Sequence, residues 1–182
     1  TVRSAGTQLL WDATYGNGRY VMAAEGGQLW GSTDGLQWTP VHQSTASRFR
    51  ALAYGSGRFV AFGGLARAAT STDGITWTET GFVDPPFNAV NARYIGGEFV
   101  AFPAFGAPRR SADGLTGQGT ELPLSLGLAD IAFGNQRWVM TGPAGQVWAT
   151  PLIPPVLTAT RQNPSLVLTW PLETEGYFLE SS

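Results

Sequence analysis

One short segment recurs four times along this chain at nearly constant spacing. An aromatic residue, a turn-forming pair of residues and a closing valine occur in residues Tyr15 to Val21, Tyr54 to Val60, Tyr94 to Val100 and Phe133 to Val139. The four closing valines are 39, 40 and 39 residues apart. A regular period of this length is typical of repeat architectures, among which propeller blades are a main option.

Two further markers follow the same period. Ser32 to Trp38 and Ser71 to Trp77 share Ser-Thr-Asp-Gly and a closing Trp, and a third copy at Ser111 to Gly117 keeps Asp-Gly but has lost the Trp. The tetrapeptide Gly27 to Trp30 returns, with one conservative change, as Gly145 to Trp148. Three markers in one register make a chance origin of the repeat very improbable.

Each of the first three periods contains four short strand-like runs, and the fourth, from Leu128 to Thr150, contains three. In the first period they are Leu10 to Tyr15, Arg19 to Ala24, Gln28 to Ser32 and Gln37 to Val41, rich in aromatic and β-branched residues. Gly, Asn and Asp separate the runs, and no segment sustains helical spacing of apolar residues. The pattern predicts an all-β propeller of four-stranded antiparallel blades in residues 1–41, 42–80, 81–122 and 123–150. We expect these blades to be part of a larger propeller.

The two ends of the chain predict incomplete elements. Thr1 to Ser4 is expected to be an outer strand, which either closes a four-bladed ring or belongs to a blade whose earlier strands are absent. The chain lacks an initiator Met and a leader, which favours the second interpretation. Residues 151–155 predict a Pro-rich linker. Residues 156–182 predict a partial β module with strands at Val156 to Thr160, Leu166 to Trp170 and Tyr177 to Ser181.

Composition excludes several chemistries. The 182 residues include no Cys, no Lys and a single His, so Cys or Lys nucleophiles, disulfides and Cys-based zinc sites are impossible. The formal net charge of -2 gives no basic surface for nucleic acid. No apolar run is long enough to span a membrane. We therefore expect no metal, no cofactor, no nucleic-acid partner and no membrane span.

The Ser-x-Asp-Gly-x-x-Trp segments resemble the Asp-box, or bacterial neuraminidase repeat, of sialidase-like propellers in secreted bacterial proteins. The box here has one residue fewer between Asp and Gly, and the fourth repeat lacks it. The resemblance implies structural turns between the third and fourth strands, in which Asp accepts turn amides, Gly supplies backbone freedom and Trp fills the space between blades. The residues concerned are Ser32, Asp34, Gly35, Trp38, Ser71, Asp73, Gly74, Trp77, Ser111, Asp113 and Gly114. The segment from Leu166 to Ser181 resembles the opening of β-sandwich modules appended to such propellers.

Three arginines also repeat, at Arg19, Arg58 and Arg137. Each follows the turn that joins the first two strands of its repeat. Because strands alternate in direction, this turn and the Asp turn are expected on the same face of the propeller. We predict ion pairs of Arg19 with Asp34 and of Arg58 with Asp73. The alternative is an arginine triad that converges on a substrate carboxylate, as in sialidases. It is disfavoured because residues at the same position of successive blades are spread around the ring and do not meet in one pocket.

The opposite face carries the loops that differ between repeats. Binding residues commonly lie on such loops, because a rigid scaffold holds them in place. The side chains there that could contact a ligand are His42, Arg48, Arg67, Asp84, Phe105 and Arg109. The alternative is that they are ordinary solvated loop residues. His42 stands beside no motif of a catalytic triad, so no catalytic residue is predicted.

The sequence thus predicts a non-catalytic binding or scaffold module in an extracellular or envelope assembly. Its expected location is secreted, periplasmic or at the cell surface, with a protein or carbohydrate partner. One alternative is a sialidase-type glycoside hydrolase, which needs an Arg cluster, a Tyr with a Glu partner and an Asp in one pocket. Another is an assembly-factor propeller, which would use an Arg-rich face.

Overall fold

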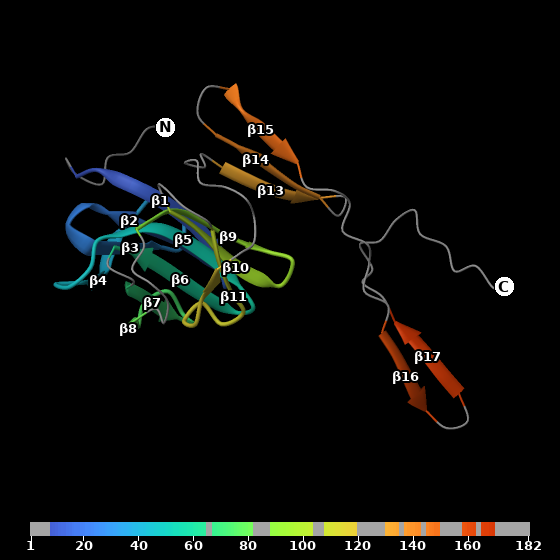
Figure 1. Cartoon of the computed structure of the whole chain (residues 1–182). Helices are drawn as coiled ribbons and strands as arrows, with labels where there is room; N and C mark the ends of the chain where they lie inside the picture. The colour runs from blue at the N-terminus through green and yellow to red at the C-terminus, as the bar shows by residue number, and fades with distance from the viewer. Residues whose placement is uncertain are drawn as a thin grey trace. The chain divides into compact units, whose positions relative to one another are not determined.

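The computed structural model describes residues 8–64, 67–81, 88–103, 108–119, 130–134, 137–142, 145–149, 158–162 and 165–169. Its strands are labelled in Figure 1. The chain divides into two units, residues 1–129 and 130–182, and each is described by itself. The expected outer strand at Thr1 to Ser4, the linker at 151–155 and the expected strand at Tyr177 to Ser181 lie outside the described residues.

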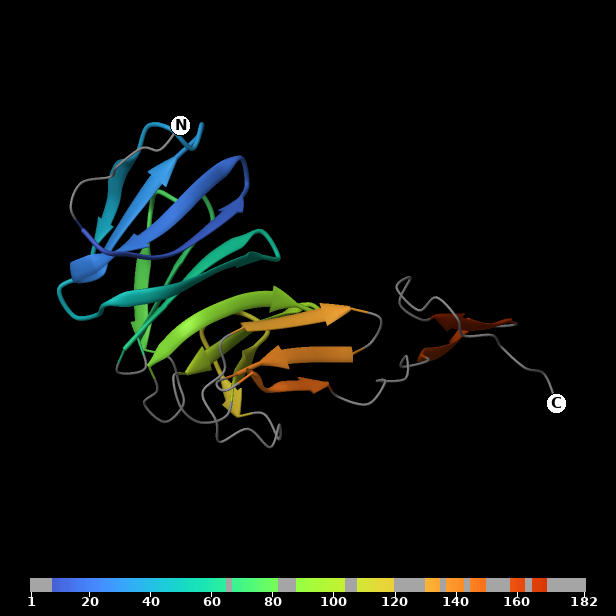
Figure 2. The same cartoon turned by 90° about the horizontal axis from the view of Figure 1, so that it is seen from above.

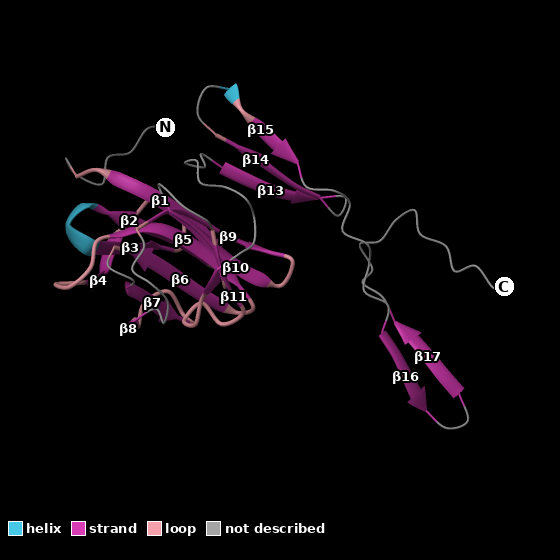
Figure 3. Cartoon of the chain, in the orientation of Figure 1, coloured by secondary structure: helices cyan, strands magenta, loops and turns pink. Residues whose placement is uncertain are grey.

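Strands and turns make up nearly all of the described structure (Figure 3). Among the described residues of the first unit, the helical exception is a 3-10 turn at Glu25–Gly27. No α-helix occurs among the described residues, and therefore no helix there is long and apolar enough to cross a membrane. The prediction of an all-β fold is confirmed.

The first repeat forms a four-stranded antiparallel sheet in the order β1-β2-β3-β4. Its strands are β1 Leu10–Gly16, β2 Arg19–Ala24, β3 Gln28–Ser32 and β4 Thr39–Gln43. The first three begin where the sequence predicts, but the fourth begins two residues later than expected. The backbone amide of Gln37 donates to the carboxylate of Asp34 at 2.8 Å, so Gln37 belongs to the turn and not to the strand.

The second and third repeats form equivalent sheets. Strands β5 to β8 are Phe49–Gly55, Arg58–Gly63, Arg67–Ser71 and Thr78–Gly81. Strands β9 to β12 are Ala89–Ile95, Glu98–Pro103, Arg109–Ser111 and Gln118–Gly119. Three successive four-stranded antiparallel sheets are the blades expected from the period, and we call them blades one, two and three.

The turn between the first two strands of each blade needs unusual backbone angles. In blade one, Asn17 and Gly18 have φ of 44° and 72°, which matches the type I′ turn favoured by hairpins with a right-handed twist. Ser56 and Gly57 repeat this geometry in blade two, with φ of 49° and 72°. The Gly-rich segments therefore act as rigid turn residues rather than as flexible links.

The hydrophobic core of the first unit lies between blades. Strands β1, β5 and β9 are neighbours in space, which places the first strand of each blade innermost. Figure 2 shows the three blades of this unit, coloured blue, teal and yellow-green, following one another. One cluster of buried residues joins blade one to blade two and contains Val21, Leu29, Phe49, Phe59 and Ala69. A second cluster joins blade two to blade three and contains Val60, Phe62, Ala89, Phe99 and Ala101.

The described residues of the second unit form two sheets. The fourth repeat forms a three-stranded antiparallel sheet, here called blade four, of β13 Asp130–Gly134, β14 Arg137–Thr141 and β15 Val147–Ala149. The C-terminal region forms an antiparallel hairpin of β16 Thr158–Gln162 and β17 Ser165–Thr169. The first hairpin strand begins two residues after the expected position, and the second begins one residue before it.

Candidate functional site

Ser and Asp side chains build the turn between the third and fourth strands of each complete blade. In blade one, Ser32 Oγ donates to Asp34 Oδ1 at 3.0 Å and accepts the amide of Gly35 at 2.9 Å. Asp34 Oδ1 also accepts the amides of Leu36 and Gln37, each at 2.8 Å. This network closes the turn through one carboxylate oxygen and one hydroxyl.

The same network recurs in the next two blades. Asp73 Oδ1 accepts the amides of Ile75 and Thr76 at 2.8 Å, and Asp113 Oδ1 accepts those of Leu115 and Thr116 at the same distance. These backbone hydrogen bonds stabilise the ionised form, so they lower the pKa of Asp73 and of Asp113 from 3.8 to about 2, and they also lower the pKa of Asp34. The three carboxylates are thus engaged by their own turns, which supports a structural role.

The two Trp side chains of these turns have different surroundings. Trp77 packs on the cluster between blades one and two, with its ring 6.3 Å from Phe59 and 6.5 Å from His42. Trp38 donates its Nε1 hydrogen to the carbonyl of Gly35 at 3.2 Å, and its ring lies 6.5 Å from that of Tyr20. Trp77 therefore fills the space between two blades, while Trp38 packs on its own blade.

Two of the three repeated arginines, Arg19 and Arg58, reach the next blade. Arg58 Nη1 donates to the backbone carbonyl of Asp113 at 3.2 Å, and the side chain of Arg19 runs beside Gly74. The predicted ion pairs of Arg19 with Asp34 and of Arg58 with Asp73 are wrong. The turn between the first two strands and the Ser-Asp-Gly turn do lie on the same face, since Asn17 Nδ2 donates to the carbonyl of Thr72 at 3.0 Å. The side chains of the first of these turns, however, reach across to the following blade.

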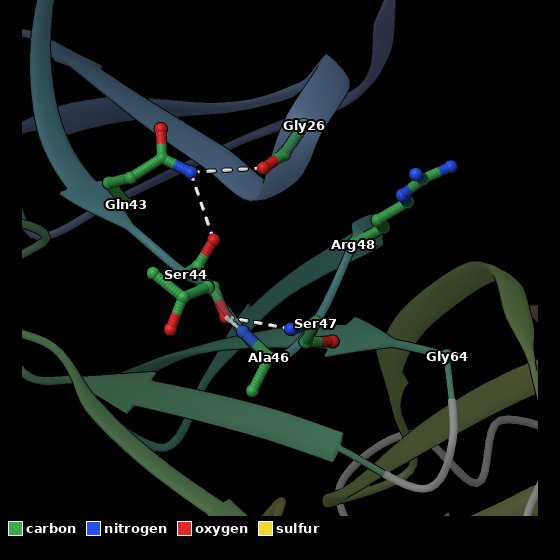
Figure 4. A pocket seen from close by; sticks show the side chains of 8 residues that line it. Gly26, Gln43, Ser44, Ala46, Ser47, Arg48 and Gly64 are labelled. Carbon is green, nitrogen blue, oxygen red and sulfur yellow. Dashed lines mark hydrogen bonds between the residues drawn. The ribbon is translucent and has the colours of Figure 1, made fainter.

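The opposite face holds an open hollow between blades one and two (Figure 4). Its volume is about 610 Å³, and its lining combines the β2–β3 turn, the connection from β4 to β5 and the end of β6: Gly26, Gln43, Ser44, Thr45, Ala46, Ser47, Arg48 and Gly64. All of these residues belong to the loops that differ between repeats. The hollow is therefore the candidate binding site of the described residues.

Side-chain hydrogen bonds fix the loop that lines the hollow. Gln43 Nε2 donates to the carbonyls of Gly26 and Ser44, both at 2.9 Å, and Ser44 Oγ accepts the amides of Ala46 and Ser47. Within the described residues the buried hydroxyl of Ser47 has no hydrogen-bond partner. Figure 4 shows the guanidinium of Arg48 pointing away from the Ser44 hydrogen bonds, which leaves a cation beside a rigid polar loop.

His42 lies on β4 and contacts blade two through a carboxylate. Its Nε2 is 2.9 Å from Glu79 Oε1, and Ser44 Oγ donates to Glu79 Oε2 at 3.0 Å. The carboxylate lies between the imidazole and the hydroxyl, so the His cannot deprotonate the Ser as in a catalytic triad. This cluster joins two blades beside the hollow. It could not be predicted from the sequence, because Glu79 belongs to no motif that the repeats share.

Of the other predicted binding residues that the structure describes, neither Arg67 nor Arg109 lines the hollow. Arg67 is exposed at the start of β7, where its amide donates to the carbonyl of Gly64 at 3.3 Å, and Arg109 is partly buried at the start of β11. Asp84 and Phe105 lie outside the described residues. Within the described parts of the chain, no three His, Asp or Glu side chains form a group that could hold a metal ion.

Comparisons with known proteins identify the architecture. No protein-family model matches the chain, and no curated protein matches it. Among solved structures, it is similar to YCF48 bound to D1 peptide, with 15% identity and a TM-score of 0.60 over 79% of this chain and 53% of the other. It is also similar to BamB from Moraxella catarrhalis, with 15% identity and a TM-score of 0.54 over 76% and 43%.

A streptogramin B lyase is a third similar structure, with 14% identity and a TM-score of 0.56 over 79% of this chain and 54% of the lyase. The described blades form part of a β-propeller. Propellers of this architecture thus include proteins with different activities, so the fold alone does not assign one. The chain spans about half the length of these solved structures.

We expect Asp73→Ala to lower the free energy of unfolding by about 1–2 kcal/mol at pH 7, by analogy with the loss of a capping side chain. The difference between wild type and variant should narrow as the pH falls from 4 towards 2. The pKa of Asp73 is depressed to about 2 in the folded chain, so its stabilisation is complete above pH 3.8 and is lost through pH 2. Urea unfolding at several pH values measures this.

The control for that experiment is Asp73→Asn, whose side-chain carbonyl can still accept the amides of Ile75 and Thr76. It should retain more stability than the alanine variant and show a weaker pH dependence than wild type. An alanine variant as stable as wild type would contradict a structural role of this carboxylate.

Proposed function

We propose that this chain is a non-catalytic binding module that engages a protein partner through the hollow between blades one and two. The observation that supports this most directly is the hollow itself. A loop held by the side chains of Gln43 and Ser44 presents the guanidinium of Arg48 beside a space of about 610 Å³. Polar groups fixed in advance bind with less loss of conformational entropy.

The chemistry of the hollow favours a carboxylate-bearing peptide. Arg48 offers a planar fork of donors that matches a carboxylate, and Thr45 offers a hydroxyl. One similar solved structure, YCF48, has a bound peptide, which is consistent with peptide recognition by a propeller of this architecture. A carbohydrate is the alternative ligand, because hydroxyls and a backbone-lined hollow could also bind a sugar.

The proposal extends to the setting of the module. The Ser-Asp-Gly turns support membership of the Asp-box type of propeller, and that resemblance favours a secreted, periplasmic or cell-surface protein within a larger assembly. Arg19 and Arg58 lie next to the turns of the following blade rather than in a shared pocket, which supports a non-catalytic role over a sialidase-type hydrolase.

A panel of fluorescein-labelled peptides with acidic C-terminal residues, each in free-acid and amidated form, tests the proposal by fluorescence anisotropy. We expect free-acid peptides to bind, and Arg48→Gln to weaken binding about tenfold, because it removes a charge-assisted hydrogen bond. Thr45→Ala, which removes a neutral hydroxyl of the lining, should weaken it less.

The matched control is Arg110→Gln, which removes the same charge from an exposed arginine paired with Glu98 and leaves the hollow intact. Binding to this control should equal that of wild type. If both arginine variants lost the same affinity for peptide, the loss would reflect net charge and not a site at Arg48. If no peptide bound to wild type, a peptide site would be contradicted. Release of sialic acid from a fluorogenic sialoside would instead support the hydrolase.

A further inference from the structure

A carboxylate of blade two binds two side chains of blade one. Glu79, on β8, has its Oε1 at 2.9 Å from His42 Nε2, and its Oε2 accepts the hydroxyl hydrogen of Ser44 at 3.0 Å. The imidazole ring in turn lies 6.0 Å from the ring of Phe49 and 6.5 Å from that of Trp77. The side chains of His42 and Glu79 are 18% and 26% exposed, so most of this cluster is shielded from water. The carboxylate is therefore held in place by its polar contacts with blade one.

This contact does not follow the repeat, unlike the Ser-Asp-Gly turns. The ladder position that Glu79 occupies on the fourth strand of its blade holds Pro40 in blade one and Gly119 in blade three. Neither of these residues carries a carboxylate, so blade three cannot bind blade two in this way. A contact needed only to stack blades would be expected at both boundaries, whereas Glu79 lies at the boundary that contains the hollow.

The hydroxyl of Ser44 connects Glu79 to the loop of the hollow. Ser44 is buried, and its Oγ accepts the amides of Ala46 at 3.2 Å and of Ser47 at 2.9 Å (Figure 4). A serine hydroxyl has a single hydrogen and rotates unless an acceptor fixes it. Because Glu79 accepts that hydrogen, the lone pairs of Ser44 Oγ stay directed at the two amides. Glu79 thus orders a loop to which it does not belong.

The backbone that follows Ser44 is closely seated between the two blades. A Cβ atom at Gly27 would overlap the carbonyl oxygen of Ser47, and a Cβ atom at Gly63 would lie 3.0 Å from the carbonyl oxygen of Arg48. Gly27 belongs to blade one and Gly63 to blade two. Packing this tight transmits small displacements instead of absorbing them. A shift of Ser44 therefore moves the backbone that carries the exposed side chain of Arg48.

We propose that Glu79 is a positioning residue of the hollow, which through Ser44 fixes the loop that presents Arg48 to a carboxylate-bearing peptide. This inference rests on the proposed function of the hollow. Charge and geometry make opposite predictions for Glu79. A carboxylate beside the hollow repels an anionic peptide, so on charge alone its removal would strengthen binding. Positioning predicts that its removal weakens binding, so the direction of the effect distinguishes the two.

Amide hydrogen exchange of the free chain, followed residue by residue by NMR, tests the order of the loop without any ligand. Glu79→Ala should speed exchange of the Ala46 and Ser47 amides about tenfold, because loss of the acceptor lets the Ser44 hydroxyl turn away. The amides of β6 should exchange at the wild-type rate. Glu79→Gln should stay within about twofold of wild type, since its side-chain carbonyl still accepts the hydroxyl hydrogen.

The matched control for exchange is Glu98→Ala, which removes a carboxylate of similar exposure that is paired with Arg110 in blade three. It should leave the exchange of Ala46 and Ser47 unchanged. Wild-type exchange of these two amides in Glu79→Ala would overturn the proposal, because it would show no link between the carboxylate and the loop. An equal rise in the amides of β6 would also overturn it, because the effect would then be a general loss of stability.

The peptides of the anisotropy panel test the consequence for binding. Glu79→Ala should weaken binding of free-acid peptides about fivefold, and Glu79→Gln should recover most of that loss. In an Arg48→Gln background, Glu79→Ala should cost less than about twofold, because the group that it positions is already gone. Tighter binding by Glu79→Ala, or the same loss in both backgrounds, would overturn the proposal. If wild type bound no peptide, the proposed function would be contradicted, and the exchange of Ala46 and Ser47 would still decide whether Glu79 fixes the loop.

Discussion

Phe59→Ala is expected to lower the free energy of unfolding by about 3–5 kcal/mol, the usual range for removing a fully buried aromatic ring. Phe59 is fully buried in the cluster that joins blades one and two, with its ring 4.6 Å from that of Tyr54 and 6.3 Å from that of Trp77. Each blade is a thin sheet that buries its faces only against its neighbours, so a cavity here removes contacts from two blades at once.

Urea unfolding followed by tryptophan fluorescence measures this loss. The control is Ile75→Ala, which truncates a side chain that is 47% exposed and should change the free energy of unfolding by no more than about 0.5 kcal/mol. Phe59→Leu should fall between the two, because it keeps most of the buried volume. A Phe59→Ala variant within 1 kcal/mol of wild type would show that blades one and two do not share this core.

Gly55→Ala is expected to destabilise the chain by about 2–3 kcal/mol, although it adds one methyl group and creates no cavity. The added Cβ would overlap the ring of Tyr94, and this ring cannot withdraw because it also packs on Phe99 at 4.8 Å between centroids. In most strands the same change would be neutral or stabilising, since alanine restricts the unfolded chain more than glycine does.

The decisive control is the same substitution in a Tyr94→Ala background. There the methyl group has space, so Gly55→Ala should cost less than about 0.5 kcal/mol, and the double-mutant cycle should give a coupling of about 2 kcal/mol between the two positions. Equal costs in both backgrounds would mean that the glycine is needed for another reason, and the ring contact between blades two and three would not explain it.

The strands of the first unit could be predicted closely from sequence, because their signals are local. Alternating apolar residues and positive-φ turn residues such as Asn17 and Gly18 act within one hairpin, and the repeat shows each signal several times. The late start of β4 was missed because no propensity rule expresses the hydrogen bond from the Gln37 amide to the Asp34 carboxylate.

The candidate site could be predicted only in outline. The face was expected from strand direction, and Arg48 lines the hollow as one of the candidate residues. The polar loop of Gln43, Ser44 and Ser47 was missed, since Ser and Gln in a connection give no signal of their own. The contact of His42 with Glu79 could not be predicted from sequence spacing either, because these residues are 37 positions apart and lie on outer strands of different blades.

The sequence by itself determined the period, the all-β class and the turn positions, because each depends on residues a few positions apart. Only the tertiary structure decided which side chains meet between blades. In the folded chain, Arg58 donates to the carbonyl of Asp113, the ring of Tyr54 lies against Gly16, and Trp77 packs on the core that blades one and two share. The physical reason is that contacts between blades depend on how one sheet is rotated against the next, and no local preference of the chain specifies that rotation.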